Sequence, residues 1–280
     1  MKNGESIKYK IGREISSSVF NIVLNPQIFN NELIPTTGKI ILCGNHLHVW
    51  DQFPVMCSTK RTIHWLAKKE YFDGKLGPVF NFMECIPVDR AGNTSLATES
   101  AIEYLNNDSA IGIFPEGTRN GLKDKHIKEL YDKYISDETY DDFSSKMKKN
   151  LPKLSQVKYL EELLFQKKIT VSELKEALNN VNETLKKYKN NGKISDFEYQ
   201  NSKLLPMYSG AVRMAKSTDA LIVPFAVAGS YKIGNKDLKV SFANPISVSN
   251  ISEEEAMKQL RNSILNEYIE IENSKVYKKR

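Results

Sequence analysis

Three short apolar runs constrain the fold of this 280-residue chain more than any other feature. The runs, at residues 40–44, 111–114 and 220–228, each have the length of one buried strand, and turn-forming residues follow them. Further strands are expected at 61–67, near Val88 and at 238–242, and helices at 95–105, 209–216 and 252–271. Repeated alternation of strands and helices indicates an α/β layer fold.

The stretch NHLHVWD, from Asn45 to Asp51, follows the first run. Asp51 with Pro54 three residues later is typical of a helix start. A straight helix would place His46 and Asp51 about 140° apart. If the first residues instead form a turn and Asp51 opens the helix, its carboxylate can fold back towards the imidazole, so that one ring nitrogen is a donor and the other can accept a proton. The alternative is that Asp51 only caps the helix and His46 is a hydrogen-bonded loop histidine.

The sequence FPEGTRN follows the second run and has the layout of a phosphate site. Gly117 lets the backbone come close to a ligand, and Thr118 offers a hydroxyl. Arg119 offers a planar fork of donors to an oxyanion. These residue types in this order favour a bound phosphate.

His46, Arg90 and Glu116 share one position in the pattern, because each lies just after an expected strand. Ligands of α/β sheets gather beyond the strand ends. We therefore expect these three side chains to converge on one edge of the sheet.

The charge balance favours anionic partners. A net charge of +6 at pH 7 suits phosphates, nucleotide-bearing cofactors or an acidic lipid surface. No nucleic-acid motif accompanies this charge, so we expect no nucleic-acid partner. Cys43, Cys57 and Cys85 are odd in number and lack CxxC spacing, which predicts neither a disulfide framework nor a zinc knuckle.

The apolar content is distributed in short stretches. No run approaches the roughly 18 residues that cross a bilayer, and the polar start MKNGESIKYK is unlike a signal peptide. We expect a protein that is soluble or lies on a membrane. Apolar residues between 9 and 24 recur with helical spacing, with basic residues near one end, which is consistent with a helix lying flat in a lipid interface. A helix packed on the domain would show the same spacing.

Segment boundaries follow from a break in the alternation. We expect an N-terminal amphipathic helix at 1–30, an α/β core at 31–120 and 207–250, a helical insertion at 121–206, and a C-terminal helix with a basic tail at 251–280. The insertion is rich in Lys, and its helix starts at Thr170 and Ser195 each have a Glu three residues later. A two-heptad seam predicts a helical hairpin with its turn at 190–192; the seam residues are Leu174, Leu178, Val181, Leu185 and Tyr188.

Four blocks of the sequence, NHLHVWD, IPVDR, FPEGTR and IVPFAVAGS, occur in the order of the conserved blocks of the glycerolipid acyltransferases. The chain most resembles the 1-acyl-sn-glycerol-3-phosphate acyltransferase family. The resemblance implies a mixed central sheet flanked by helices. It also implies transfer of a fatty acyl group from acyl-CoA or acyl carrier protein to the sn-2 hydroxyl of 1-acyl-glycerol-3-phosphate, which gives phosphatidic acid.

The resemblance assigns roles to individual residues. His46 would be the general base and Asp51 would orient it, without an acyl-enzyme intermediate. The acceptor phosphate would be held by Arg90, Glu116, Gly117, Thr118 and Arg119, with Asn45 and Pro224 at the pocket. Because a Pro in a buried strand is unusual, Pro224 is expected at a bulge or a sheet edge. No metal and no cofactor are expected, apart from the acyl donor.

Three departures from the family pattern leave the acceptor open. Glu84 stands where a Gly is usual, six residues before the block-two Arg, and Tyr208 and Ser209 stand where one or two Lys are usual. The insertion after FPEGTR is the third, and it is a candidate to bind a partner that the sequence does not identify. Glycerol 3-phosphate, another lysophospholipid or a lipid-linked amine therefore remain alternative acceptors.

Two other classes of function compete with this interpretation. His46, His48 and Asp51 have the spacing of a zinc site in a metallohydrolase, although His64 and His126 complete no cluster. A non-catalytic lipid-surface protein, with the insertion as its working part, is the second. The acyltransferase interpretation places the protein in the cytoplasm, peripheral on the cytoplasmic face of the membrane.

Overall fold

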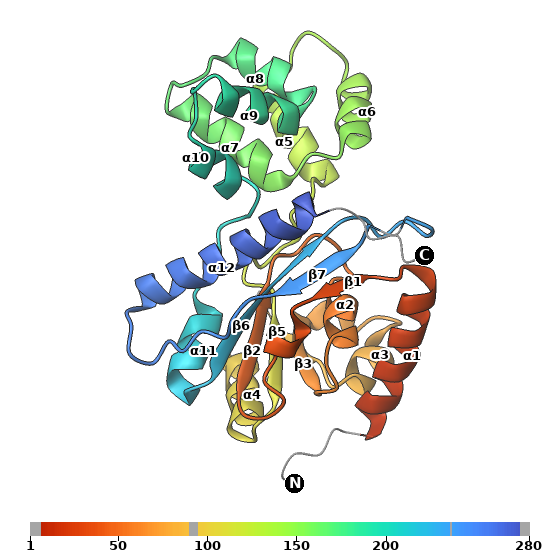
Figure 1. Ribbon diagram of the computed structural model, residues 1–280. Helices are drawn as coiled ribbons and strands as arrows, with labels where there is room; N and C mark the ends of the chain where they lie inside the picture. The colour runs from red at the N-terminus through yellow and green to blue at the C-terminus, as the bar shows by residue number, and fades with distance from the viewer. Residues whose placement is uncertain (1–6, 90–94, 236, 275–280) are drawn as a thin grey trace. The chain divides into compact units, whose positions relative to one another are not determined.

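The computed structural model describes residues 7–89, 95–235 and 237–274, which fall into two compact units (Figure 1). The core unit comprises the chain up to Gly117 and from Met207 onwards. The insertion unit is Thr118–Pro206. Each unit is described by itself.

A mixed sheet forms the centre of the core unit, as the resemblance implied. Within the described residues it has seven strands, in the order β1-β7-β6-β2-β5-β3-β4. The strands are β1 (Gln27–Phe29), β2 (Ile40–Gly44), β3 (Ile63–Lys68), β4 (Ile86–Val88), β5 (Ala110–Ile113), β6 (Leu221–Ala228) and β7 (Lys239–Phe242). All neighbours pair in parallel except β6 and β7. The three-residue strand β1 is missing from the sequence prediction.

Helices cover both faces of this sheet (Figure 1). They are α1 (Ile7–Val23), α2 (Gln52–Cys57), α3 (Gly77–Phe82), α4 (Ser95–Asn106), α11 (Gly210–Thr218) and α12 (Glu253–Asn273), with 3-10 turns η1 (Asn31–Leu33) and η2 (Lys69–Tyr71). Helices α4, α11 and α12 lie on one side and α1, α2 and α3 on the other. In the part of the chain that the structure describes, no helix has the combined length and apolarity that crossing a bilayer requires.

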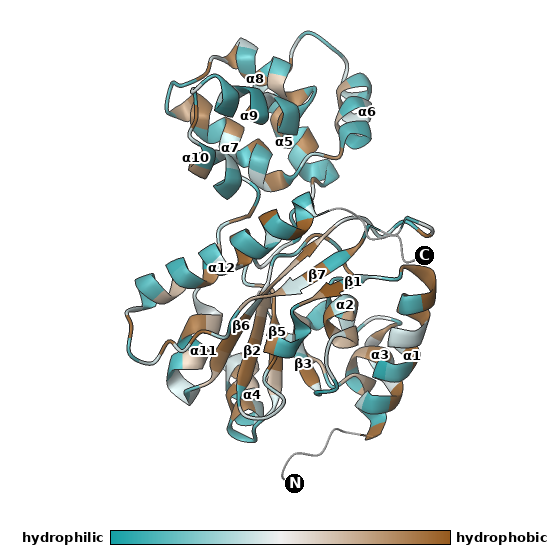
Figure 2. Cartoon of the chain, viewed as in Figure 1, coloured by the Kyte–Doolittle hydropathy of each residue, from teal (hydrophilic) through white to brown (hydrophobic). Residues whose placement is uncertain are grey.

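The period-two alternation of the strands separates two apolar layers, and the central strands β2, β5 and β6 are mostly brown in Figure 2. On one face, Leu42 of β2 belongs to the same cluster as Phe20 of α1 and Val55 of α2. On the other face, Ala226 of β6 packs with Tyr268 of α12. The sheet is therefore buried on both sides, which explains why its central strands are continuous apolar runs.

Pro224 lies in an interior strand, so the prediction of a sheet edge is wrong, whereas its alternative, a bulge, agrees with the pairing. It pairs in register with Cys43 of β2 in an uninterrupted parallel ladder. Ile222, two residues earlier, donates to the β7 side of β6, where its N–H meets Ile246 O. Pro224 faces the same side, and its O accepts from Ala243 N at 2.9 Å. Between this pair and the bridge from Ile222 to Ile246, the segment after β7 has one extra residue, which is the pattern of a β-bulge. The missing N–H therefore removes one hydrogen bond beside this bulge.

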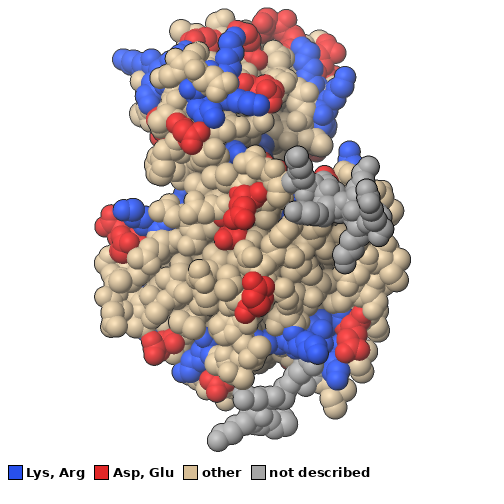
Figure 3. Space-filling model, in the orientation of Figure 1, with Lys and Arg blue, Asp and Glu red and all other residues tan. Residues whose placement is uncertain are grey.

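The insertion unit is helical and has its own apolar core. Its helices are α5 (Asp124–Tyr134), α6 (Tyr140–Asn150), α7 (Leu154–Phe165), α8 (Val171–Leu178), α9 (Val181–Asn190) and α10 (Asp196–Asn201). The predicted seam residues are all buried, but they are shared between α8 and α9. The predicted turn at 190–192 follows α9. Figure 3 shows lysines and acidic side chains densely mixed on the outside of this unit.

Two consecutive hairpins of the insertion unit, α7–α8 and α9–α10, repeat one pattern. The N-caps Thr170 and Ser195 are 25 positions apart, and each forms a capping box with a Glu three residues later. The hairpins are joined reciprocally. Lys168 of the first pairs with Glu198 of the second at 3.0 Å, and Lys193 of the second pairs with Glu173 of the first. The two predicted helix starts are thus equivalent positions of an internal repeat.

Candidate functional site

The end of β2 is held close to β6 immediately before His46. Gly44 is required here, because a Cβ would lie 2.2 Å from the ring of Phe225. The side chain of Asn45, which is fully buried, donates from Nδ2 to Val227 O at 2.9 Å and accepts at Oδ1 from Val227 N at 2.8 Å. The Asn45 amide therefore fixes the point at which the chain leaves the sheet.

His46 and Asp51 are in direct contact. His46 Nδ1 lies 2.8 Å from Asp51 Oδ2, and Asp51 is fully buried at the start of α2. The same Oδ2 accepts from Leu47 N at 2.6 Å and from His48 N at 2.7 Å. The prediction that the carboxylate folds back to the imidazole is confirmed. The reading of Asp51 as a mere cap is wrong, because its side chain makes no capping hydrogen bond to α2.

The geometry defines the chemical state of the His46 ring. An acceptor carboxylate beside Nδ1 requires the proton on that nitrogen, so Nε2 carries the lone pair that can take a proton. The ring stacks on Phe114, which follows β5, with centroids 4.1 Å apart and planes 12° apart. The His46 side chain is 19% exposed. The site therefore presents a fixed, accessible base.

Tyr231 is a site residue that the sequence reasoning missed. Its hydroxyl donates to Asp51 Oδ1 at 2.6 Å. Burial, the charge of Asp51 and this hydrogen bond raise the pKa of Tyr231 well above its usual value, so the phenol remains a donor. The sequence signal for it is its place just after the block IVPFAVAGS, in the loop that follows β6, the strand next to β2.

Glu116 and Gly117 follow β5, which pairs in parallel with β2. The expectation that His46 and Glu116 share one sheet edge is confirmed. Glu116 is buried, and Gly117 has φ +66°. A Cβ at Gly117 would lie 2.9 Å from the Tyr208 ring, whose own backbone N–H donates to Pro115 O at 2.9 Å. A glycine is therefore needed at Gly117 by both conformation and space.

Arg261 of α12 is a second residue that the sequence reasoning missed. Burial lowers the pKa of its guanidinium, and the negative charge of Glu116 opposes that shift. Helix α12 therefore brings a cation within electrostatic range of Glu116. Nothing local in the sequence of α12 distinguishes Arg261 from a surface arginine.

The structure does not place the remaining residues of the predicted phosphate site relative to His46. Thr118 and Arg119 begin the insertion unit, where Thr118 Oγ1 accepts from Lys123 Nζ at 3.4 Å. Arg90 lies outside the described residues, as does the predicted basic tail. Convergence of these three residues with His46 stays a prediction.

The zinc reading of His46, His48 and Asp51 does not match the geometry. The His48 ring stacks on Tyr231, with centroids 4.4 Å apart, and His48 Nδ1 accepts from Trp50 N at 3.3 Å. Both oxygens of Asp51 already accept hydrogen bonds. Among the described residues, no cluster of three or more His, Cys, Asp or Glu could hold a metal ion.

The cysteines are poor candidates for a nucleophile. Burial raises the pKa of Cys85 to about 12 and raises that of Cys43 further. Burial also raises the pKa of Cys57. All three thiols are free and remain protonated near neutral pH.

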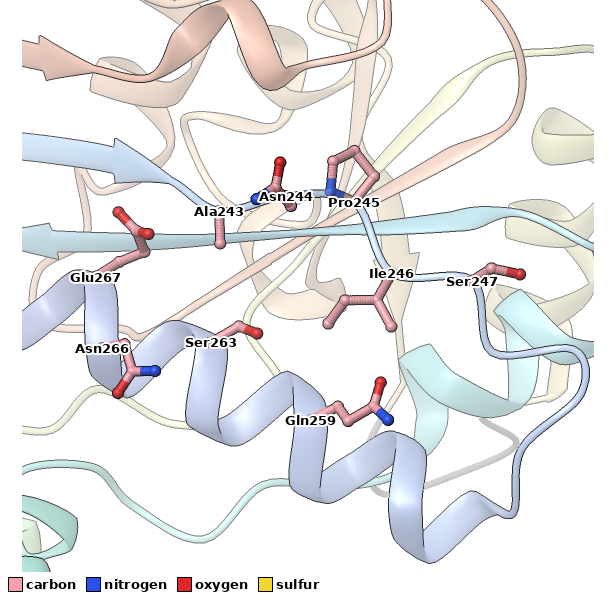
Figure 4. A pocket seen from close by; sticks show the side chains of 9 residues that line it. All are labelled: Ala243, Asn244, Pro245, Ile246, Ser247, Gln259, Ser263, Asn266 and Glu267. Carbon is pink, nitrogen blue, oxygen red and sulfur yellow. The ribbon is translucent and has the colours of Figure 1, made fainter.

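A groove of the core unit is separate from these residues. It has a volume of about 430 Å³ and lies between α12 and the segment after β7 (Figure 4). Gln259, Ser263, Asn266 and Glu267 project from α12 towards Ala243–Ser247. The lining includes no predicted site residue, no cation and no nucleophilic thiol. We therefore treat the groove as separate from the site around His46.

Comparison with known proteins identifies similar chains. A family model described as Acyltransferase matches residues 25–228. The 1-acyl-sn-glycerol-3-phosphate acyltransferase of Bacillus subtilis (strain 168) is 28% identical over 95 residues, which cover 33% of this chain and 48% of that protein. The chain thus aligns with about half the length of this curated relative.

The fold also matches a solved structure. The crystal structure of the 1-acyl-sn-glycerophosphate (LPA) acyltransferase PlsC from Thermotoga maritima has a TM-score of 0.57 and 15% sequence identity to this chain. The match covers 96% of this chain and 81% of that one. At this identity the likeness is one of fold.

Proposed function

Because the chain belongs to the Acyltransferase family, we propose that it transfers a fatty acyl group to the sn-2 hydroxyl of 1-acyl-glycerol-3-phosphate, giving phosphatidic acid. The donor is the thioester of acyl-CoA or acyl carrier protein. The partial match to the B. subtilis enzyme supports this acceptor. Both donors suit a chain of net charge +6, since CoA is polyphosphorylated and the carrier protein is acidic.

The observation that carries the proposal is the 2.8 Å contact between His46 and Asp51. His46 Nε2 takes the proton of the acceptor hydroxyl as its oxygen attacks the thioester carbonyl carbon. The tetrahedral intermediate then expels the thiolate, which takes the proton from the imidazolium as the C–S bond breaks. Asp51 holds the ring and stabilises its charged form. Neither a protein nucleophile nor a cofactor takes part.

The acceptor phosphate is assigned to the residues after β4 and β5. Arg90 and Arg119 offer guanidinium forks that suit phosphate oxygens. Gly117 and Thr118 offer backbone and hydroxyl contacts. Glu116 is an anion, so it suits a glycerol hydroxyl better than the phosphate itself. Pro224 remains a candidate for the pocket wall.

A membrane surface is the proposed location, on the cytoplasmic face. Helix α1 packs on α2 and α3 through Tyr9, Gly12 and Phe20. Its other face is an apolar stripe that includes Ile7, Ile15 and Ile22, which are 76%, 61% and 83% exposed. Exposed lysines at 8 and 10 accompany the stripe. The sequence allowed a helix packed on the domain or a helix lying in a lipid interface, and the two faces of α1 support both. The apolar stripe suits insertion between lipid headgroups.

The decisive experiment is thiol release from acyl-CoA and from acyl carrier protein, with 1-acyl-glycerol-3-phosphate as acceptor. Release should require the acceptor and should fall by about 10²–10⁴-fold in His46→Ala. Parallel assays with glycerol 3-phosphate, another lysophospholipid and a lipid-linked amine decide the acceptor. Folded protein that releases no thiol with any of these acceptors would refute the proposal and favour a non-catalytic lipid-surface role.

A further inference from the structure

We propose that Tyr231 is a positioning residue for the base: its hydroxyl locks the Asp51 carboxylate in the orientation that holds His46 Nδ1. The inference rests on the proposed function for its kinetic consequence, but its structural content is independent of the acceptor. Tyr231 is assigned no contact with substrate.

The hydrogen bonds of Asp51 come from two directions. Oδ2 accepts from His46 Nδ1, Leu47 N and His48 N, all within the turn that precedes α2. Oδ1 accepts from Tyr231, which is 180 positions away in the sequence. The local turn therefore holds one oxygen, and Tyr231 holds the other. With both oxygens held, the carboxylate cannot rotate about its Cβ–Cγ bond without breaking a charge-assisted hydrogen bond.

Tyr231 is itself fixed in place. Its ring stacks on His48, with planes 21° apart, and meets Phe20 and Trp50 edge-on at 6.5 and 6.1 Å between centroids. The loop that carries it is closed by Asp237, whose Oδ1 accepts from Ser230 N and Ser230 Oγ. A phenol held this way has little orientational freedom to lose when it binds Asp51.

The protonation of Tyr231 favours the same role. Its raised pKa means that the hydroxyl donates throughout the neutral range. Asp51 is fully buried, so removal of this donor would leave Oδ1 without the hydrogen bond it has and with little water to replace it. The carboxylate would then reorient, and the Nδ1–H tautomer of His46 would no longer be favoured over the Nε2–H tautomer.

Tyr231→Phe separates positioning from packing, because it keeps the ring that stacks on His48 and removes only the hydroxyl. In full-length protein we expect kcat to fall about 10–100-fold, the usual effect of a lost hydrogen bond to a buried charge, with KM for acyl-CoA unchanged. Tyr231→Leu, which also removes the stacking, should lower thermal stability as well. Tyr104→Phe is the matched control. Tyr104 also stacks on a histidine, His64, with ring centroids 3.7 Å apart, but it is not part of the site around His46. Its activity should equal that of the wild type.

The tautomer of His46 gives a readout that does not depend on turnover. The chain has four histidines, so the His46 nitrogen signals can be assigned by comparison with His46→Ala. We expect Nδ1–H in the wild type and a mixture of both tautomers in Tyr231→Phe. An unchanged tautomer together with kcat within twofold of the wild type would overturn the proposal. If no acceptor supports transfer, the proposed function fails, and the tautomer still decides the role of Tyr231.

Discussion

The side chain of Asn45 and the backbone of Val227 exchange two hydrogen bonds just beyond the parallel ladder of β2 and β6. The register of β2 and β6 ends with Gly44 opposite Phe225, so the Asn45 amide supplies the two partners that a longer β2 backbone would have given Val227. Because a side chain makes this pair, the backbone of Asn45 is released from the sheet. The next residue, His46, can then turn over the sheet edge.

Asn45→Ala should therefore destabilise the core unit. The substitution leaves the buried N–H and C=O of Val227 without these partners, at a cost of about 2–4 kcal/mol. Denaturant unfolding followed by Trp fluorescence measures the core unit, because both tryptophans, Trp50 and Trp65, belong to it. Asn45→Asp, which keeps an acceptor for Val227 N, should lie between alanine and the wild type. Equal stability of all three would contradict this account.

Asp51→Asn should lower turnover by about 10²–10⁴-fold. The amide has one acceptor atom where the carboxylate offers two oxygens to four donors, so His46 loses its orienting partner. The measurement is kcat with acyl-CoA at saturating acceptor. Asp73→Asn, an exposed position in the same unit, is the control and should leave kcat unchanged. Wild-type turnover in Asp51→Asn would remove Asp51 from the mechanism.

Charges on the apolar stripe of α1 should weaken lipid binding. In Ile11→Glu/Ile15→Glu, two exposed apolar side chains are replaced, and binding to anionic vesicles should fall at least tenfold. Vesicle co-sedimentation measures the effect. The control is Phe165→Glu, at a position 89% exposed on the insertion unit. Equal losses from both variants would mean that α1 is not the lipid-binding surface.

Acid should destabilise the insertion unit. The Lys193 ammonium and the Thr170 N–H lower the pKa of Glu173 to about 2, and the Ser195 N–H and Lys168 lower that of Glu198 to about 2, from an ordinary 4.5. A carboxyl with a lowered folded-state pKa stabilises the fold above its unfolded pKa. This contribution is therefore complete above about pH 4.5 and is lost as the pH falls towards 2.

Two probes separate this effect from unfolding of the core unit. Far-UV circular dichroism reports the helices of both units, whereas Trp fluorescence reports the core unit alone, so a transition seen only by circular dichroism belongs to the insertion unit. The transition seen by circular dichroism and not by fluorescence should move to lower denaturant concentration between pH 5 and pH 3 in the wild type. The shift should be smaller in Glu173→Gln/Glu198→Gln. A wild-type transition that does not move would contradict the lowered pKa values.

Replacement of residues 123–204 by a short Gly-Ser bridge should leave the core unit folded. The hydrogen bond from Tyr208 N to Pro115 O already ties the two core segments together on either side of the insertion. The remaining cost of folding for the shortened chain is then the entropy of closing the Gly-Ser loop. The test is a cooperative unfolding transition by Trp fluorescence with a wild-type midpoint. Aggregation of the variant would show that the insertion is part of the core.

Local patterns were sufficient to predict the strands other than β1, the contact between His46 and Asp51, and the capping boxes. His46 and Asp51 lie five positions apart, so the turn and helix start that unite them are visible in one stretch. Asn45–Val227 and Tyr231–Asp51 join residues 182 and 180 positions apart, and no local spacing encodes such contacts. Strand β1 was missed because three residues carry too little periodicity.

The misplacement of Pro224 has a similar physical origin. A sequence shows that Pro lacks an N–H, but not on which side of its strand that N–H would have pointed. Here it points to the β7 side, next to a register shift that exists only after β6 has paired with the segment that follows it in the chain. Arg261 was missed for the same reason, because its relation to Glu116 exists only after α12 has packed on the sheet.

The hydrogen bond between Tyr208 and Pro115 holds together the two points of the core unit between which the insertion is connected. The core's two chain ends meet there, so any folded module whose own ends are close together could be grafted in place of Thr118–Pro206. Such an exchange would also replace Thr118 and Arg119, which are predicted to hold the acceptor phosphate. A change of module at this position is therefore also a change at the predicted phosphate site.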